Sequence, residues 1–262
     1  MELADRNVVI TGAGSGIGRA LALRFAGEQP RALVLADVNE SAVQAVAEEV
    51  GGLAVRTDVS SEQDIRALVE RAREFGGPID LFCSNAGIGG PGGGPEASNE
   101  ELQRTWEINV MAHIWAARAV LPEMLERGEG YLMSTASAAG LLTQVSALAY
   151  SITKHAAVAA AEWIAVTYGD AGIKVSCLCP LGVRTPMLEM ALDDQVGAAA
   201  LLADEVLEPA DVAEAVVVAI REERFLILPH EIVRKYVALK GADHERWLTG
   251  MRRLVRGARP GQ

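Results

Sequence analysis

A glycine-rich turn between a short apolar strand and a helix is the feature that most limits how this chain can fold. Residues 6–11 (Arg-Asn-Val-Val-Ile-Thr) have the pattern of a buried strand, and residues 17–27 have that of a helix. Gly12 and Gly16 lie between the two, and Gly18 lies at the helix start. Glycine lets a backbone approach phosphate groups closely, and a helix N-terminus favours negative charge. This context indicates a dinucleotide site, with a plain tight turn as the alternative for the glycines alone.

The alternation of strand and helix continues through most of the chain. Further apolar runs predict strands at residues 31–37, 53–58, 79–84, 130–135, 172–180 and 225–228. Helical patterns separate them, which predicts a doubly wound α/β fold: a mostly parallel sheet of about seven strands with helices on both faces. We expect residues 1–262 to form a single domain, because this length suits one α/β unit.

Composition and charge argue against several classes of partner. The formal net charge of −11 and the pI near 4.9 disfavour binding to nucleic acid and to anionic lipid. No uninterrupted apolar run reaches the ~18 residues of a membrane span, and the charged N-terminus passes directly into a strand without a secretory signal. Cys83, Cys177 and Cys179 are odd in number, lack metal-ligand spacing and lie in apolar runs. We therefore expect reduced core thiols, no metal and a cytoplasmic location.

Tyr150 and Lys154 are polar residues four positions apart at the start of an apolar helical segment. At that spacing they lie on one face of the helix. A Lys154 ammonium can stabilise the phenolate of Tyr150. Lowering a pKa from ~10 to ~7 takes about 4 kcal/mol, and a cation at ~4 Å with an effective dielectric constant of ~20 supplies about that much. The pair can then do acid–base chemistry, whereas the alternative is a packed tyrosine beside a lysine that extends to solvent.

Five motifs taken together resemble the short-chain dehydrogenase/reductase family. They are the Thr11–Gly18 turn, Asn85-Ala-Gly87, Asn109, Ser137 and Tyr150-x-x-x-Lys154, in this order and at these separations. The resemblance covers about residues 4–186 and implies NAD-dependent interconversion of a secondary alcohol and its ketone. The glycine spacing Gly-x-x-x-Gly-x-Gly, in place of Gly-x-Gly-x-x-Gly, is the version that this family uses.

The resemblance implies cofactor contacts near the N-terminus. The pyrophosphate would lie on Gly12, Ser15, Gly16, Ile17 and Gly18. Asp37, at the end of the second predicted strand, would accept hydrogen bonds from the adenosine ribose and repel a 2′-phosphate. Ala13 and Val38 put no cation there, so NAD is expected rather than NADP. The alternative for Asp37 is a turn or a helix N-cap before Asn39.

Later cofactor contacts are implied by the same resemblance. Asp58 would bond to the adenine amine and Val59 would pack on the ring, although Asp58 could equally cap the helix that starts near Ser61. The remaining contacts are expected at Asn85, Ala86, Gly87, Tyr150, Lys154, Pro180, Gly182, Val183 and Thr185. Among them Asn85 would support the central sheet, or simply form a turn. Leu181 replaces a glycine that the family usually has, which brings an apolar side chain near the substrate.

Three of the catalytic residues implied by the resemblance lie close together in the sequence. Tyr150 would be the acid–base group, and Lys154 would lower its pKa and bind the nicotinamide ribose. Ser137 would hold the substrate oxygen beside Tyr150. It is preferred to Ser134 and Thr135 because it lies thirteen residues before Tyr150, whereas the other two belong to a predicted strand.

Asn109, the fourth catalytic residue, lies inside a helical region predicted over residues 99–127, where an asparagine is unfavourable. The resemblance implies that a helix kink frees its backbone carbonyl to bind a water next to Lys154, which completes a proton relay. An ordinary polar contact is the alternative. Residues 88–95 (Ile-Gly-Gly-Pro-Gly-Gly-Gly-Pro) form the most flexible stretch and are expected over the mouth of the site.

Apolar residues near the expected site indicate a bulky, uncharged alcohol as substrate, with a sugar or polyol as the second choice. Substrate contacts are expected at Ser137, Leu141, Val145, Tyr150, Leu181, Met187 and Leu188. Residues 186–208 would form a substrate-covering loop or else a surface helix, and residues 230–262 a C-terminal helical extension. The resemblance also implies a homo-oligomer, either a dimer or a tetramer. A non-catalytic dinucleotide sensor is the alternative function, but it would not require the three catalytic side chains that are present.

Overall fold

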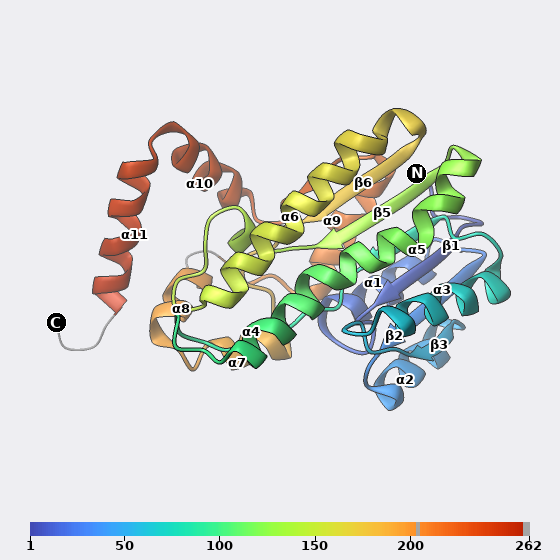
Figure 1. The fold of residues 1–262 in the computed structure, drawn as a ribbon, viewed down its shortest axis with the longest axis horizontal. Helices are drawn as coiled ribbons and strands as arrows, with labels where there is room; N and C mark the ends of the chain where they lie inside the picture. Colours follow the sequence, from blue (N-terminus) through green and yellow to red (C-terminus); the bar gives the residue numbers. More distant parts are fainter. Residues whose placement is uncertain (203–204, 259–262) are drawn as a thin grey trace.

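The computed structural model describes residues 1–202 and 205–258, and this part contains one parallel sheet of seven strands (Figure 1). The strands are β1 (Asn7–Thr11), β2 (Ala32–Asp37), β3 (Leu53–Arg56), β4 (Leu81–Ser84), β5 (Gly130–Thr135), β6 (Ile173–Leu178) and β7 (Leu226–Ile227). Their order in the sheet is β3-β2-β1-β4-β5-β6-β7. The predicted doubly wound sheet is confirmed. Its order reverses between β1 and β4, which is where ligands of such sheets bind.

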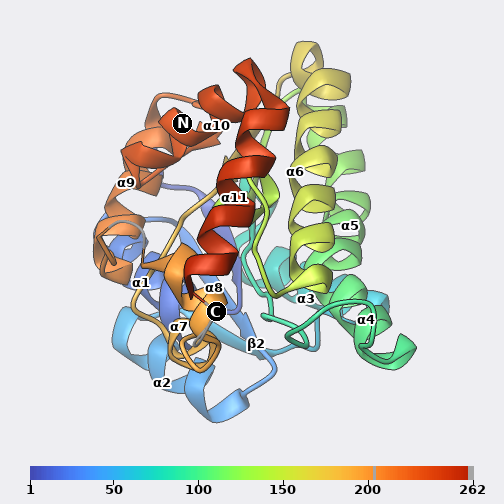
Figure 2. The ribbon, with the colours of Figure 1, turned by 90° about the vertical axis from the view of Figure 1, so that its left-hand side faces the viewer.

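Helices cover both faces of the sheet (Figures 1 and 2). The first face carries α1 (Gly16–Ala26), α2 (Glu40–Val50) and α9 (Pro209–Arg221), and the second carries α3 (Glu62–Gly76), α5 (Ala112–Arg127) and α6 (Leu148–Tyr168). Successive side chains of a strand point to opposite faces. Val8 and Ile10 of β1 therefore pack in the first core cluster, and Val9 packs in the second. Because both faces are buried, the strands are continuous apolar runs, as the sequence showed.

The helical region predicted over residues 99–127 changes its hydrogen-bond pattern near the middle. α4 (Asn99–Trp106) is followed by η1 (Glu107–Met111), a π-helical segment, and then by α5. A π-helical turn accommodates an extra residue, and such turns are frequent at functional sites. The irregularity expected at Asn109 is therefore present, as a π-helical turn.

Two strands end two residues earlier than the sequence predicted. β3 stops at Arg56 because the Asp58 carboxylate accepts hydrogen bonds from Ser60 and starts a turn. β6 stops at Leu178, two residues before Pro180, which has no N–H to donate to a neighbouring strand. Two short 3₁₀ segments, η2 (Ala138–Gly140) and η3 (Gly169–Ala171), complete the connections around β5 and β6.

The covering segment and the C-terminal extension both lie beyond the carboxyl ends of the strands (Figure 1). The segment predicted as a substrate-covering loop contains two short helices, α7 (Pro186–Ala191) and α8 (Gln195–Leu201), and its residues 203–204 lie outside the described part of the chain. The predicted C-terminal extension forms α10 (Glu231–Ala242) and α11 (His244–Ala258), and its residues 259–262 also lie outside. α11 packs against α8 (Figure 2).

The glycine-rich segment over residues 88–95 runs beside the connection that leads into α6. The Gly93 amide donates to the Ser146 carbonyl at 2.7 Å, and the Leu148 amide donates to the Gly93 carbonyl at 3.0 Å. Within residues 1–202 and 205–258, no helix is both long and apolar enough to cross a membrane. In the same ranges, no group of three or more His, Cys, Asp or Glu side chains could hold a metal ion.

Candidate active site

The turn between β1 and α1 has a backbone that requires glycine. Gly12 has a φ of +67°, and a Cβ atom there would lie 2.8 Å from the Cα of Ala86. At Gly18 a Cβ would lie 2.0 Å from the carbonyl oxygen of Gly12. Ser15 is the N-cap of α1, yet its side chain makes no capping hydrogen bond. The first amides of α1 and the Ser15 hydroxyl can therefore bind an anion.

Asp37 ends β2 beside this turn. Its carboxylate accepts hydrogen bonds from the Gly14 amide and from the Asn39 amide, both at 2.9 Å. The helix that follows is capped by Asn39, whose side chain accepts from the Ala42 amide. Asp37 is therefore not the N-cap of α2, although it does hold the adjoining turn. Each carboxylate oxygen keeps a further lone pair for another donor.

Asp58 and Val59 follow β3. The Asp58 carboxylate accepts from the backbone and the hydroxyl of Ser60, and these hydrogen bonds hold the pKa of Asp58 below its ordinary value. The N-cap of α3 is Ser61, whose hydroxyl accepts from the Asp64 amide at 3.2 Å. The alternative that Asp58 caps this helix was therefore wrong, because the serine takes that place. Val59 is buried in the core on the α3 side of the sheet.

Asn85 joins two strands at the point where the sheet order reverses. Its side-chain amide donates to the Thr11 carbonyl at 3.0 Å, and its side-chain oxygen accepts from the Thr135 hydroxyl at 3.0 Å. The Thr11 hydroxyl accepts from the amides of Asn85 and Ala86, at 3.0 and 3.1 Å. The Asn85 side chain thus links the ends of β1 and β5, and the Thr11 hydroxyl holds the backbone of Ala86 beside the glycine turn.

Asn109 is fully buried in η1, and its side chain connects three segments. Oδ1 accepts from the Ile88 amide at 2.9 Å, and Nδ2 donates to the Ile88 carbonyl at 2.9 Å and to the Thr153 hydroxyl at 3.2 Å. A Cβ at Gly87 would lie 3.2 Å from Asn109 Oδ1 and 3.3 Å from Lys154 Nζ, so these two groups face the same strand end. The polar contacts given as the alternative for Asn109 are present, and the relay through its carbonyl stays a prediction.

Ser137, Tyr150 and Lys154 converge beyond the end of β5. Lys154 is only 2% exposed, and its Nζ donates to the Thr135 carbonyl at 3.1 Å. The same Nζ lies 5.6 Å from the ring centroid of Tyr150. Ser137 Oγ accepts from the Ala139 amide at 3.1 Å and lies beside the Tyr150 hydroxyl. The structure therefore brings together the three side chains that the sequence singled out.

The electrostatics of this group differ from the expectation for Tyr150. Burial raises the pKa of Tyr150, and the neighbouring Ser137 hydroxyl offsets part of that increase. Burial lowers the pKa of Lys154 to about 8. Without cofactor, desolvation dominates and the ammonium lies over the ring rather than at the hydroxyl, so the net pKa of Tyr150 is not lowered. That Lys154 lowers the pKa of Tyr150 in the working enzyme stays a prediction.

The loop after β6 runs between the glycine turn and the serine segment. A Cβ at Gly16 would lie 3.2 Å from the methyl carbon of Thr185. The Thr185 hydroxyl donates to the carbonyl of Val183, a buried residue, at 3.2 Å. At the other end of the loop, the Pro180 carbonyl accepts from the Ala138 amide at 2.8 Å. The loop expected to contact the nicotinamide therefore borders both parts of the site.

Leu141 and Leu181, two of the expected substrate contacts, pack against one apolar cluster beyond β5. The buried centre of this cluster consists of Ala138, Leu142 and Val233. The other three apolar contacts that we expected are not brought into it: Val145 is half-buried, Met187 is exposed and Leu188 is buried. Four of the ten residues of the cluster come from α10, whose position there no sequence pattern predicts.

Sequence reasoning missed three polar residues around the site. His113 is buried one turn after Asn109, His230 is buried at the start of α10, and Lys240 lies near the end of α10. None of them has a motif or a spacing that predicts a role. Their neighbours are distant in the sequence, so only the folded structure shows what they contact.

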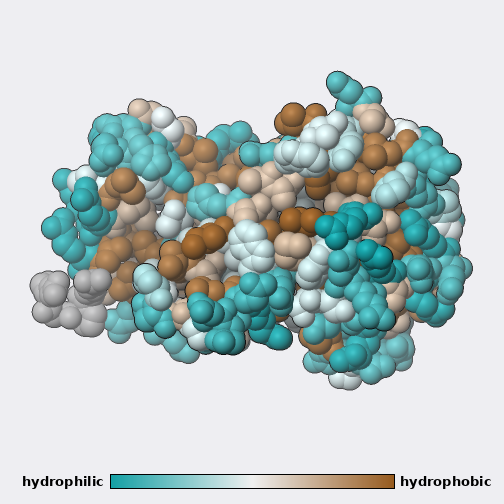
Figure 3. Space-filling view, in the orientation of Figure 1, coloured by the Kyte–Doolittle hydropathy of each residue, from teal (hydrophilic) through white to brown (hydrophobic). Residues whose placement is uncertain are grey.

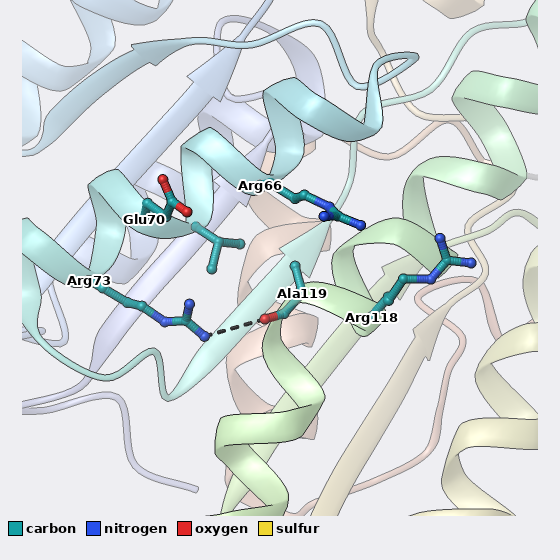
Figure 4. A pocket seen from close by; sticks show the side chains of 6 residues that line it. Arg66, Glu70, Arg73, Arg118 and Ala119 are labelled. Carbon is teal, nitrogen blue, oxygen red and sulfur yellow. Dashed lines mark hydrogen bonds between the residues drawn. The ribbon is translucent and has the colours of Figure 1, made fainter.

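A separate surface cavity of about 280 Å³ lies between α3 and α5 and shares no residue with this site (Figure 4). It is lined by Arg66, Val69, Glu70, Arg73, Arg118 and Ala119. Its arginines already pair with carboxylates: Arg66 and Arg118 with Glu62 at 2.9 Å, and Arg73 with Glu123 at 2.8 Å. The pairs of Arg118 and Arg73 join the two helices, that of Arg66 lies within α3, and so these arginines need no further anion.

Known proteins provide an independent comparison. Residues 6–196 match the model of the short chain dehydrogenase family. The 1-deoxy-11-beta-hydroxypentalenate dehydrogenase of Streptomyces exfoliatus is 36% identical over 242 residues, which cover 89% of this chain and 86% of that protein. The 2,5-dichloro-2,5-cyclohexadiene-1,4-diol dehydrogenase of Sphingobium indicum is 36% identical over 202 residues, 75% of this chain and 80% of that protein. A short chain dehydrogenase/reductase from Burkholderia phymatum, solved in complex with NAD, is 33% identical with a TM-score of 0.85.

The match to the NAD-bound structure extends beyond the residues that the family model covers. The family model ends at residue 196, before α9, α10 and α11. The NAD-bound structure nevertheless covers 94% of this chain and 96% of its own. With the seven-stranded parallel sheet and the convergence of Ser137, Tyr150 and Lys154, these matches show that the chain belongs to the short-chain dehydrogenase/reductase family of oxidoreductases.

Proposed function

We propose that the protein is an NAD-dependent dehydrogenase that interconverts a secondary alcohol and its ketone, and so acts on CH–OH groups. The observation that carries this proposal is the convergence of Ser137, Tyr150 and Lys154 at the end of β5, beside the glycine turn. Two relatives support it, since their names describe dehydrogenases of hydroxylated compounds. A non-catalytic sensor would need the turn but not the three side chains.

The residues around the sheet reversal fit a dinucleotide. The turn at Gly12 and Gly16 leaves the N-terminus of α1 accessible to a pyrophosphate, which the Ser15 hydroxyl can also bind. Asp37 has acceptor capacity for ribose hydroxyls, and its charge would repel a 2′-phosphate. Ala13, which lies within this turn, supplies no compensating cation. These features favour NAD over NADP.

The catalytic side chains then have distinct tasks. When bound, the nicotinamide supplies the acceptor for hydride. The Ser137 hydroxyl holds the substrate oxygen next to Tyr150, which takes the alcohol proton in oxidation and returns it in reduction. Lys154, fixed by its hydrogen bond to the Thr135 carbonyl, keeps positive charge near the tyrosine ring and favours a transient phenolate. Asn109 continues the proton path toward solvent through its carbonyl.

The substrate that we propose is a bulky, apolar, cyclic alcohol. The apolar cluster next to Ser137 includes Leu141 and Leu181, whose side chains are only partly buried and so leave apolar surface for a substrate. An apolar lining of this kind gains free energy from each ring carbon that it removes from water. The related enzymes are named for a hydroxypentalenate and for a dichlorocyclohexadienediol, both cyclic compounds. Met187, exposed on α7, would close over the ring from the covering segment 186–208.

The outer face of α6 indicates that the protein assembles with further copies of itself. One outer face of α6 carries a stripe of large apolar side chains: Leu148, Ile152, Trp163 and Val166. Trp163 is 60% exposed and Val166 is 87% exposed, which is unusual for a surface that stays in water. A second subunit would bury this stripe, so we propose a homo-oligomer, a dimer or a tetramer.

The three buried free thiols favour a cytoplasmic enzyme.

The test is nicotinamide reduction by the purified protein with NAD or NADP, over a panel of cyclic and acyclic secondary alcohols. We expect turnover with NAD and cyclic alcohols, and its loss in Tyr150→Phe, which removes the proton-transfer group and little volume. Binding of NADH should survive in that variant. Tight binding of NADH without turnover of any alcohol would instead favour the sensor.

A further inference from the structure

His230 holds the loop after β6 from the start of α10. Its Nδ1 accepts from the Leu181 amide at 3.2 Å, and its Nε2 lies 3.1 Å from the Gly182 carbonyl oxygen. Because an amide can only donate, Nδ1 must be the acceptor and Nε2 must carry the proton. The ring is 3% exposed and is the N-cap residue of α10. The backbone at Leu181 is therefore fixed by a side chain from another element.

Lys240 holds a second loop from the other end of the same helix. Its Nζ donates to the Leu141 carbonyl at 2.7 Å and to the Leu142 carbonyl at 3.3 Å. These carbonyls belong to the segment that directly follows Ser137 and η2. Nearby, Thr143 and Ser146 have positive φ angles of 121° and 62°, which non-glycine residues adopt at a cost. A strained loop of this kind keeps its shape only if the surroundings hold it.

Apolar packing fills the space between these two attachments. Val233 of α10 is buried with Ala138 and Leu142, and Tyr236 packs on that cluster together with Trp247 of α11. The two aromatic rings lie 6.1 Å apart, centroid to centroid. Figure 3 shows apolar residues gathered at this end of the molecule, between α11 and α8. One helix therefore contacts both loops that border the candidate site and packs against them along its length.

We propose that α10 is a brace for the active site, in which His230 positions the nicotinamide-side loop and Lys240 positions the substrate-side loop after Ser137. The assignment of the two sides rests on the proposed function. Neither residue touches the reacting atoms, so both are positioning residues. The brace predicts two separable effects from one helix: loss of the Lys240 contacts weakens binding of the alcohol, and loss of the His230 contacts weakens binding of the cofactor.

Lys240→Met tests the substrate side, because methionine keeps most of the aliphatic chain and removes the donor. We expect the KM for the alcohol to rise about tenfold, a change typical of losing hydrogen bonds from a charged group. The dissociation constant of NADH should change less than about twofold. Lys235→Met is the matched control, since Lys235 is exposed on the same helix and makes no hydrogen bond or ion pair to any described residue.

His230→Leu and His230→Gln test the cofactor side. Leucine removes both hydrogen bonds, and we expect the dissociation constant of NADH to rise about tenfold. Glutamine offers one acceptor and one donor on the same side chain, so it should recover part of the affinity. A helix that merely stabilised the fold would change the alcohol KM and the NADH affinity together in both sets of variants.

Hydrogen exchange over residues 138–146, measured by mass spectrometry, tests the brace without any turnover. Exchange should accelerate in Lys240→Met and not in Lys235→Met. If exchange responds in this way while no alcohol is turned over, the brace stands and the proposed function fails. If the wild type turns over alcohols but Lys240→Met matches Lys235→Met in KM and in exchange, the brace is wrong.

Discussion

The glycine turn of the cofactor site and the loops that α10 holds are shaped by different kinds of interaction. At the glycine turn, the backbone determines the shape: the Gly12–Gly18 turn packs against Ala86, and strand ends supply Asp37 and Asn85. In the two loops, side chains from a distant segment hold the backbone, as Lys240 does for the stretch after Ser137 and His230 for the loop after β6. The first arrangement depends on neighbours close in the sequence or on adjacent strands, and the second depends on the C-terminal helices.

The two arrangements tolerate amino-acid substitution to different degrees. At Gly12 and Gly18 the turn has no room for a Cβ atom, so few sequences fit it and the turn can be recognised in the sequence. Loops held by a helix from outside the core can change shape when that helix changes, while the sheet remains intact. Substrate choice can therefore vary on a constant cofactor site, in keeping with the general rule that function is located in sites carried by a common fold.

The largest expected effect separates Ser137 from Ser134, two of the three hydroxyls considered for the catalytic role. Ser137→Ala should lower kcat by roughly 10²–10³, the cost of losing a hydrogen bond to the developing charge. Ser134→Ala is the control, because Ser134 lies in β5 and is buried there. Ser134→Ala should leave kcat within about threefold of the wild-type value. Equal losses in steady-state kinetics would show that the hydroxyl beside Tyr150 has no special role.

The next effect tests how strictly the backbone controls the cofactor side. Gly18→Ala should destabilise the protein by about 1–3 kcal/mol, because overpacking forces the turn to move. A Cβ at Gly18 would collide with the Gly12 carbonyl oxygen, whereas one at Gly250, within α11, would meet no atom within 4 Å. Gly250→Ala should therefore be neutral or stabilising by up to ~1 kcal/mol. Thermal unfolding of both variants, with and without NADH, measures the contrast.

These two regions also differed in how far the sequence predicted them. The alternation of strands and helices, the glycine turn, and the set of Ser137, Tyr150 and Lys154 were all predicted, because periodicity and spacing are local properties of a sequence. The pKa of Tyr150 was not, since burial acts through the whole surroundings of the ring. The contacts of Lys240 were not either, because its acceptors are carbonyls nearly a hundred residues away, and any residue has a carbonyl.

A smaller effect concerns the choice between NAD and NADP. Asp37→Asn removes the negative charge that would repel a 2′-phosphate but keeps an acceptor for the Gly14 amide. We expect kcat/KM for NADP relative to NAD to rise about tenfold, a change of about 1.4 kcal/mol. Glu40→Gln, a charge change in the first turn of α2, is the control. An unchanged ratio in Asp37→Asn would mean that the carboxylate serves only the turn.

A last effect, on stability rather than activity, concerns the buried His113 in α5. The ring is 5% exposed, and among the described residues neither nitrogen has a hydrogen-bond partner. Burial and the nearby Lys154 ammonium lower the pKa of His113 to about 3, although the Asn109 carbonyl beside it opposes this shift. The ring therefore stays neutral in the folded protein at pH values where it becomes protonated in the unfolded chain, whose ordinary value is ~6.5.

The sign of the resulting pH dependence follows from proton counting. Below pH ~6.5 the unfolded chain binds a proton at His113 that the folded protein does not, so acid favours unfolding. The free energy of unfolding should fall by about 1 kcal/mol per pH unit between pH ~6 and ~4 through this residue alone. Urea unfolding of the wild type and of His113→Gln across that interval measures it as the difference in slope. His155→Gln is the control, since His155 is only half-buried and its ring already contacts the Ser151 carbonyl. If His113→Gln kept the wild-type slope, the loss of stability in acid would have to come from other groups, and the buried ring would be accessible to protons after all.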